Sequence, residues 1–393
     1  MNRLVLLFLV AALASPACAD ALPAWLSAVD TAELAPGEKS LWQEADEFDQ
    51  ALLRAGKVNT DPALTAYLQG IMDRLYPEFQ GRLTVRLLNA QHINAFALPN
   101  GSIYVNAGLV ARFENEAQLA TVMAHEGAHF THRHSLQQAE RVKNAAAFAL
   151  VVGMLGVPLV GDLVALSSMF GYSREHEREA DEIGYQRLLA AGYAPRETIR
   201  TFEHLQAEIK AADIKEPFFF ASHPKLQERI DSFSELVKDA NSGEVARARF
   251  VEATARLRLA SLEADLAAYR YKQIILVLSD AEHRREYPPE ASHYLGEAYR
   301  LRGEAGDLDT AEREFNSVIE TAPRFAPTHR ALGLLYYKRG DTEKAAPLLR
   351  RYLELAPDAT DRGYVEYYLA DLEKRNPASS GKPSLTPPDG ITP

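Results

Sequence analysis

The segment His125-Glu126-Gly127-Ala128-His129 combines the residue types and the spacing of a hydrolytic metal site. Residues four apart lie on one face of an α-helix, so the two imidazoles can bind the same ion. Histidine nitrogens are common zinc ligands, and a glutamate beside them can activate a water molecule for hydrolysis. The pattern predicts that His125 and His129 bind zinc and that Glu126 is the general base.

A catalytic zinc ion needs a third protein ligand and an open position for the substrate. In the HExxHxxGxxH arrangement this third ligand is another histidine. Here His132 stands at the glycine position and Ser135 at the position of the third histidine, which excludes that arrangement. We expect His132 and His134 to lie on the surface, beyond the end of the helix.

A later acidic segment, SREHEREADEIG at residues 173–184, offers carboxylates for the third position. The candidates are Glu175, Glu177, Glu179 and Glu182. Glu177 and Asp181 are four residues apart, so Glu177 could bind zinc while Asp181 orients a ligand histidine. The alternative interpretation is a solvated, charged helix face without a role in metal binding.

Apolar periodicity predicts the elements that must position these residues. Residues 20 to about 80 have helical spacing. Residues 83–88 and 102–105 are typical of strands, and Pro99-Asn100-Gly101 is typical of a hairpin turn. Asn115 can cap a helix that carries the HEGAH motif, and we expect further helices from Ser173 to about residue 238.

The C-terminal part of the chain repeats itself. Leu295-Gly296 and Leu332-Gly333 are equivalent, and Pro323 and Pro357 are 34 residues apart (357 − 323). This spacing is the tetratricopeptide period. After a linker at 239–243 we therefore predict a repeat domain over residues 250–375, with a weaker first copy at 250–287 and a capping helix at 362–375. The Pro-rich residues 376–393 are predicted to be a disordered tail.

Charge and the N-terminus limit the partners and the location. The chain has a net charge of −11, with 54 acidic and 43 basic residues, which argues against a nucleic-acid partner. Residues 1–19 are typical of a signal peptide that is cleaved before Asp20. A lipoprotein that keeps Cys18 is less favoured, because Ser15 and Pro16 do not fit such a signal. The apolar run at 145–160 predicts a buried hairpin or active-site cover, or alternatively contact with a membrane surface.

Four motifs occur together in one order. They are HEGAH, SREHEREADEIG, residues 94–101, and Ser222-His223-Pro224 followed by Arg229. Over residues 60–235 the chain resembles the gluzincin metalloproteases of the HtpX and CAAX-prenyl-protease family. The resemblance implies one zinc ion per chain, Glu177 as its third ligand, and Asp181 as a supporting residue.

The resemblance also implies roles around the open position of the metal. His223 would lie near the ion and either occupy that position or stabilise the transition state, and Arg229 would assist. A strand at the edge of the sheet would hold the substrate in an extended form by backbone hydrogen bonds. The residues of that edge strand would be Ser102, Ile103, Tyr104 and Val105.

The expected fold is mostly α-helical. A zincin-type α+β metalloprotease domain with a small β-sheet would cover residues 20–240, and the all-α tetratricopeptide-repeat domain would follow it. Signal peptide, repeats and resemblance together indicate a periplasmic zinc endopeptidase of protein quality control or outer-membrane assembly. Its expected partners are unfolded or misassembled proteins and, through the repeats, the outer-membrane assembly machinery. The alternative is a periplasmic chaperone or assembly adaptor with a latent or structural zinc site.

Overall fold

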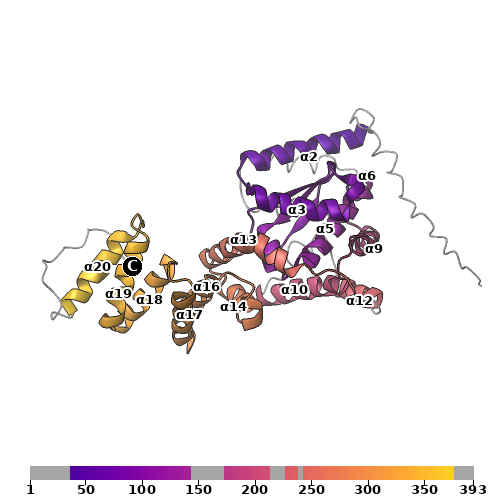
Figure 1. Ribbon diagram of the computed structural model, residues 1–393. Helices are drawn as coiled ribbons and strands as arrows, with labels where there is room; N and C mark the ends of the chain where they lie inside the picture. Colours follow the sequence, from indigo (N-terminus) through magenta and orange to yellow (C-terminus); the bar gives the residue numbers. More distant parts are fainter. Residues whose placement is uncertain (1–35, 143–171, 213–225, 238–241, 376–393) are drawn as a thin grey trace, which may run out of the picture.

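The computed structural model describes residues 36–142, 172–212, 226–237 and 242–375 (Figure 1). The predicted signal peptide 1–19, the apolar segment 145–160, His223 and the tail 376–393 lie outside the described residues. Within the described ranges, no helix has both the length and the apolar character that crossing a membrane requires. The structure is mostly helical with one small sheet, as predicted.

The first part of the chain surrounds a three-stranded sheet. Its helices are α2 (Pro36–Arg54), α3 (Pro62–Leu75), the 3₁₀ helix η2 (Pro77–Phe79), α4 (Ala107–Arg112), α5 (Glu116–Thr131), α6 (His134–Val142), α9 (Arg174–Ala190), α10 (Arg196–Ala212) and α12 (Leu226–Val237). Its strands are β1 (Thr84–Leu88), β2 (Ala95–Ala97) and β3 (Ser102–Asn106). Helix α2 covers one face of the sheet through Phe48, which packs on Phe96 and Tyr104. Helices α3 and α5 join the core on the other face.

The strand order is β1-β3-β2, which corrects one expectation. Strand β3 holds the predicted edge residues Ser102, Ile103, Tyr104 and Val105, but it is the central strand, parallel to β1 and antiparallel to β2. All of its residues are buried because helices cover both faces and strands flank both edges. The three-residue strand β2 was too short to predict from its pattern, and it takes the edge position instead.

Helix α5 carries the HEGAH motif and is buried along its whole length. It begins as predicted, because the Asn115 side chain accepts a hydrogen bond from the backbone N–H of Gln118. Helix α9 packs closely against it at Gly184, where a Cβ atom would lie 3.1 Å from the backbone nitrogen of His125. The glycine of the acidic segment therefore lets the two motif-bearing helices approach each other.

Gly127, inside the motif, also makes a close approach. A Cβ atom at this position would lie 2.3 Å from Cε2 of Tyr76, whose hydroxyl donates a hydrogen bond of 2.5 Å to the carbonyl of Ala124. We expect Gly127→Ala to lower the free energy of unfolding by about 1–3 kcal/mol through overpacking, measured by urea denaturation. The matched control is Gly70→Ala on the exposed face of α3, which has no atom within 4 Å and should be neutral or stabilising. Equal effects of the two substitutions would contradict this account.

The second part of the chain is an array of helices that extends away from the sheet (Figure 1). Its helices are α13 (Arg247–Ala267), α14 (Tyr271–Leu278), α15 (Ala281–Arg284), α16 (Ala291–Arg302), α17 (Asp307–Thr321), α18 (Ala326–Arg339), α19 (Thr342–Leu355) and α20 (Arg362–Arg375). Helices α16 and α17 form one packed pair, and α18 and α19 form the next. Cβ atoms at the equivalent Gly296 and Gly333 would lie 2.6 and 2.8 Å from Phe315 and Leu349 of the paired helices.

Helix α13 links the two parts. Its residues Phe250 and Leu257 belong to the core around the sheet, whereas Leu262 packs with α14 and α16. The predicted start of the repeats at residue 250 therefore falls inside a helix that both cores share. The assignment of the helix pairs as tetratricopeptide repeats stays a prediction.

Candidate metal centre

Three predicted ligands converge between α5 and α9. The Nε2 atoms of His125 and His129 lie 3.0 Å apart, and each lies 3.5 Å from a carboxylate oxygen of Glu177. All three side chains are buried, and among the described residues they form the one group of His, Cys, Asp or Glu ligand atoms close enough to hold an ion. The other glutamates that the acidic segment offered, Glu175, Glu179 and Glu182, are exposed.

The separations suit zinc. Four tetrahedral ligands at about 2.0–2.1 Å from an ion lie about 3.3–3.4 Å from one another. The measured separations of 3.0, 3.5 and 3.5 Å lie on either side of that value. The set of two nitrogens and one carboxylate oxygen is also the donor chemistry of a catalytic zinc site, which leaves a fourth position open.

Asp181 and Arg229 contact Nδ1 of His125, the ring nitrogen that does not face Glu177. Asp181 Oδ1 lies 3.0 Å from His125 Nδ1, and Arg229 donates two hydrogen bonds of 3.0 and 2.6 Å to the Asp181 carboxylate. Burial opposes ionisation of Asp181, but the charge of Arg229 and the contact with His125 lower the pKa of Asp181. Arg229 Nη2 also lies 3.1 Å from His125 Nδ1. Arg229 Nη1 lies 3.9 Å from Glu177 Oε2 as well, so Arg229 contacts both a ligand histidine and the ligand glutamate. Its expected assistance at the transition state stays a prediction.

The contacts of His125 affect its protonation. Burial and the charge of Arg229 lower the pKa of His125, but hydrogen bonds with Asp181 and Glu177 outweigh them and raise it to about 9. A ligand imidazole must be neutral at the nitrogen that binds the metal, so an ion that binds here has to displace a proton.

His129 is positioned by residues that the sequence did not indicate. The ring of Tyr172 stacks on His129 with centroids 3.7 Å apart, and His134 Nδ1 lies 2.9 Å from His129 Nδ1. We expected His134 on the surface, but its side chain is 0% exposed. Arg133 has a left-handed backbone (φ 56°), and the chain turns there between α5 and α6. Nothing in the residue pattern predicts that turn. His132, which we also expected on the surface, is half-buried.

Glu126, the predicted general base, is fully buried beside the two ligand histidines. Burial raises the pKa of Tyr172, and the negative charges of Glu126 and Glu177 raise it further. Glu126 and Glu177 thus both act electrostatically on Tyr172, the ring that stacks on His129. His223, the remaining predicted site residue, lies outside the described residues.

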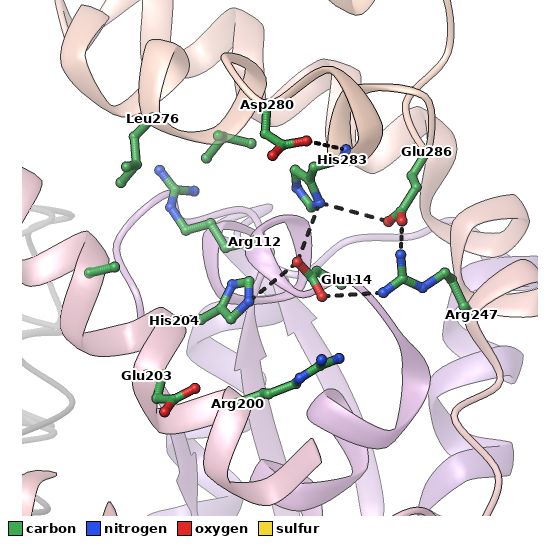
Figure 2. Close-up of a pocket in the computed structure, with 12 residues that line it drawn as sticks. Arg112, Glu114, Arg200, Glu203, His204, Arg247, Leu276, Asp280, His283 and Glu286 are labelled. Atoms are coloured by element: carbon green, nitrogen blue, oxygen red, sulfur yellow. Dashed lines mark hydrogen bonds and ion pairs between the residues drawn. The ribbon is translucent and has the colours of Figure 1, made fainter. Parts of the chain in front are cut away.

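A separate cavity of about 700 Å³ lies between α10 and the α14–α15 pair (Figure 2). Glu114, one residue before the cap of α5, is its central ionic group. Its carboxylate lies 3.4 Å from His204 Nε2, 3.3 Å from Arg247 Nη2 and 3.6 Å from His283 Nδ1. These contacts connect the start of the motif-bearing helix to the helical array.

The Glu114 cluster predicts a specific pH dependence. The hydrogen bond with His204 lowers the pKa of Glu114 from 4.5 to about 2, although burial opposes the shift. Between these two pKa values Glu114 is protonated in the unfolded chain but ionised in the folded one. Ionised Glu114 therefore adds to the free energy of unfolding above about pH 4.5, and this contribution is lost as the pH falls towards 2. We expect Glu114→Gln to reduce the free energy of unfolding by about 1–3 kcal/mol at pH 7, and by less at pH 3.5.

Urea denaturation at both pH values checks this prediction. Glu203→Gln is the matched control, because the Glu203 side chain lines the same cavity but is exposed. A stability difference between wild type and Glu114→Gln that does not change with pH would contradict the proposed ionic origin.

Comparisons with known proteins point to one class of enzyme. Residues 62–237 match peptidase family M48, close to the range 60–235 over which the motifs resemble gluzincin metalloproteases. The chain is 28% identical over 256 residues to the putative beta-barrel assembly-enhancing protease of Vibrio cholerae, covering 60% of this chain and 52% of that protein. It is 29% identical over 205 residues to the beta-barrel assembly-enhancing protease of Escherichia coli, covering 48% and 42%.

A mitochondrial relative also matches this chain. The identity to the mitochondrial metalloendopeptidase OMA1 of Arabidopsis thaliana is 32% over 209 residues, which covers 52% of this chain and 40% of that protein. The matches thus span about half the length of these relatives, or less.

Proposed function

We propose that this protein is a zinc-dependent endopeptidase of the periplasm that acts in the quality control or assembly of outer-membrane proteins. The observation that carries the proposal is the convergence of His125, His129 and Glu177 at separations suited to zinc. The family match and the metalloendopeptidase relatives support the zinc metalloprotease class. The names of the bacterial relatives support a role in β-barrel assembly.

Each residue of the centre has a role in this proposal. His125, His129 and Glu177 hold zinc, and Asp181, itself held by Arg229, keeps the His125 ring in place. Bound zinc would supply Lewis acidity for the attacking water and the peptide carbonyl. Glu126 takes a proton from the water as it attacks the peptide and returns it to the leaving amine. The role of His223 stays a prediction from the sequence resemblance.

The sheet suggests where the substrate binds. Leu98 N–H bonds to the Ser102 carbonyl, and Asn106 N–H bonds to the Asn94 carbonyl. In an antiparallel pair, every second residue of a strand forms hydrogen bonds with its neighbour, so Phe96 and Tyr104 form the pair between these two contacts. The backbone N–H and C=O groups of the intervening Ala95 and Ala97 therefore point away from β3. Strand β2 also packs against α5. We propose that an extended, unfolded or misassembled polypeptide pairs with β2, rather than with β3.

A second candidate function is that of a periplasmic chaperone or assembly adaptor. The observation that favours it is the array of helix pairs from α16 to α20, which extends away from the metal centre (Figure 1). Stacked helix pairs of the tetratricopeptide type provide extended surfaces for binding other proteins. This role is compatible with proteolysis, because the array would select a client that the metal centre cleaves.

The proposal is tested on the chain that begins at Asp20. We expect about one zinc per chain by elemental analysis and cleavage of unfolded casein that a chelator stops and added zinc restores. A chain that binds no zinc when refolded with excess metal would overturn the proposal. Cleavage that continues unchanged in the chelator would overturn it as well. N-terminal sequencing of the protein from the periplasmic fraction tests the predicted export.

A further inference from the structure

We infer that His134 is a positioning residue of the metal centre, which sets the tautomer and the orientation of the ligand His129. The inference rests on the proposed zinc site and adds a residue that the HEGAH motif and the acidic segment do not contain. It starts from the contact between two imidazoles, His129 Nδ1 and His134 Nδ1, which are 2.9 Å apart.

The contact defines where the protons lie. His129 directs Nε2 at His125 and Glu177, so this nitrogen must be unprotonated to bind a metal. A neutral imidazole then carries its hydrogen on Nδ1, from which His129 donates to His134 Nδ1. His134 in turn carries its hydrogen on Nε2, which lies 3.3 Å from Glu179 Oε2. The geometry thus assigns a continuous path of hydrogen bonds from Glu179 through His134 to His129.

The surroundings keep His134 in this position. Its ring stacks on His176 of α9 with centroids 4.6 Å apart and planes 12° from parallel. His176 Nε2 lies 3.1 Å from the Gln137 side-chain oxygen, which anchors the stack to α6. Tyr172 stacks on the ring of His129 and so fixes the partner of His134 as well. A residue that served only to fill space would not need to direct one nitrogen at a ligand and the other at a carboxylate.

The two ligand histidines are therefore supported in different ways. His125 contacts a carboxylate directly, and Arg229 holds that carboxylate. His129 contacts a second imidazole, that of His134, and the carboxylate behind it, Glu179, has a side chain that is 50% exposed. Because outer partners orient a ligand imidazole and raise its basicity, loss of the His134 acceptor should weaken zinc binding.

The test compares two side chains of similar size at position 134 in the full-length chain. Asparagine places an oxygen where Nδ1 of histidine lies and can still accept from His129, whereas leucine cannot. We expect His134→Leu to weaken zinc binding by about 10–100-fold in a competition assay, and His134→Asn to restore most of that loss. The absorption spectrum of the cobalt-substituted protein should change with leucine and stay close to wild type with asparagine.

Further variants distinguish loss of the hydrogen-bond path from a general effect of the substitution on folding. Glu179→Ala removes the acceptor of the His134 Nε2–H, and we expect it to weaken zinc binding by about 2–10-fold, while the control Glu182→Ala on the same helix leaves it unchanged. Equal zinc affinity and equal cobalt spectra of the leucine and asparagine variants would overturn the inference. If the leucine variant does not fold, unchanged zinc affinity in Glu179→Ala overturns the path by itself. Absence of zinc from the wild type would instead refute the proposed function.

Discussion

Replacing Glu126 by glutamine is expected to leave zinc bound and to lower kcat for peptide cleavage by about 10²–10⁴-fold. Glutamine has nearly the same size as the buried Glu126 side chain, so the centre should keep its shape. Its amide cannot take a proton from the attacking water, and the proton on which departure of the amine depends is then missing. Elemental analysis and casein cleavage by the same preparation measure both halves of this prediction.

The control for this variant is Glu182→Gln, which removes an exposed carboxylate from α9. It should cleave casein at the wild-type rate. A Glu126→Gln protein that also cleaves at the wild-type rate would show that Glu126 is not the base.

The same variant separates the two candidate functions. In cells that lack the wild-type gene, Glu126→Gln should fail to restore envelope integrity if proteolysis is the required activity. Rescue by this inactive variant would favour the chaperone or adaptor function, which depends on the helical array and not on Glu126.

Replacing Glu177 by alanine is expected to remove both zinc and activity. The substitution leaves two histidines, and a catalytic zinc site uses three protein ligands. Since the loss of an outer partner alone weakens metal binding by about 10–100-fold, loss of a ligand should weaken it by more than about 100-fold. Competition with a chelating dye and elemental analysis after dialysis check this result.

Glu175→Ala is the matched control, because Glu175 lies two residues earlier on α9 with an exposed side chain. It should keep the wild-type zinc content. Unchanged zinc content in Glu177→Ala would mean that another group supplies the third ligand, even though Glu177 lies 3.5 Å from each histidine.

Much of the metal centre could be predicted because its information is local. The spacing of His125 and His129 places them on one helix face whatever surrounds the helix, and Asn115 caps that helix through its own side chain. The same holds for Glu177 and Asp181 on α9, although the sequence resemblance was needed to choose Glu177 among four glutamates. Such a motif can be recognised in the sequence, because the fixed period of the helix tells which residues share a face.

Other features depend on contacts between segments that are far apart in the sequence. The central position of β3 follows from the insertion of that strand between β1 and β2, which no alternation pattern encodes. The burial of His134 depends on the left-handed turn at Arg133 and on packing against His176, a residue of another helix. Arg229 reaches His125 only because α12 packs against the same core as α5.

The residue pattern therefore indicated the candidate metal ligands, the helices that carry them, and the chemistry that these residue types allow. The fold shows which carboxylate meets the two imidazoles, which residues support each ligand, and which strands lie at the edges of the sheet. This difference arises because the spacing of side chains along a helix is set by backbone geometry alone. The meeting of two helices or strands depends instead on packing over the whole core, including close approaches such as that of Gly184 to His125.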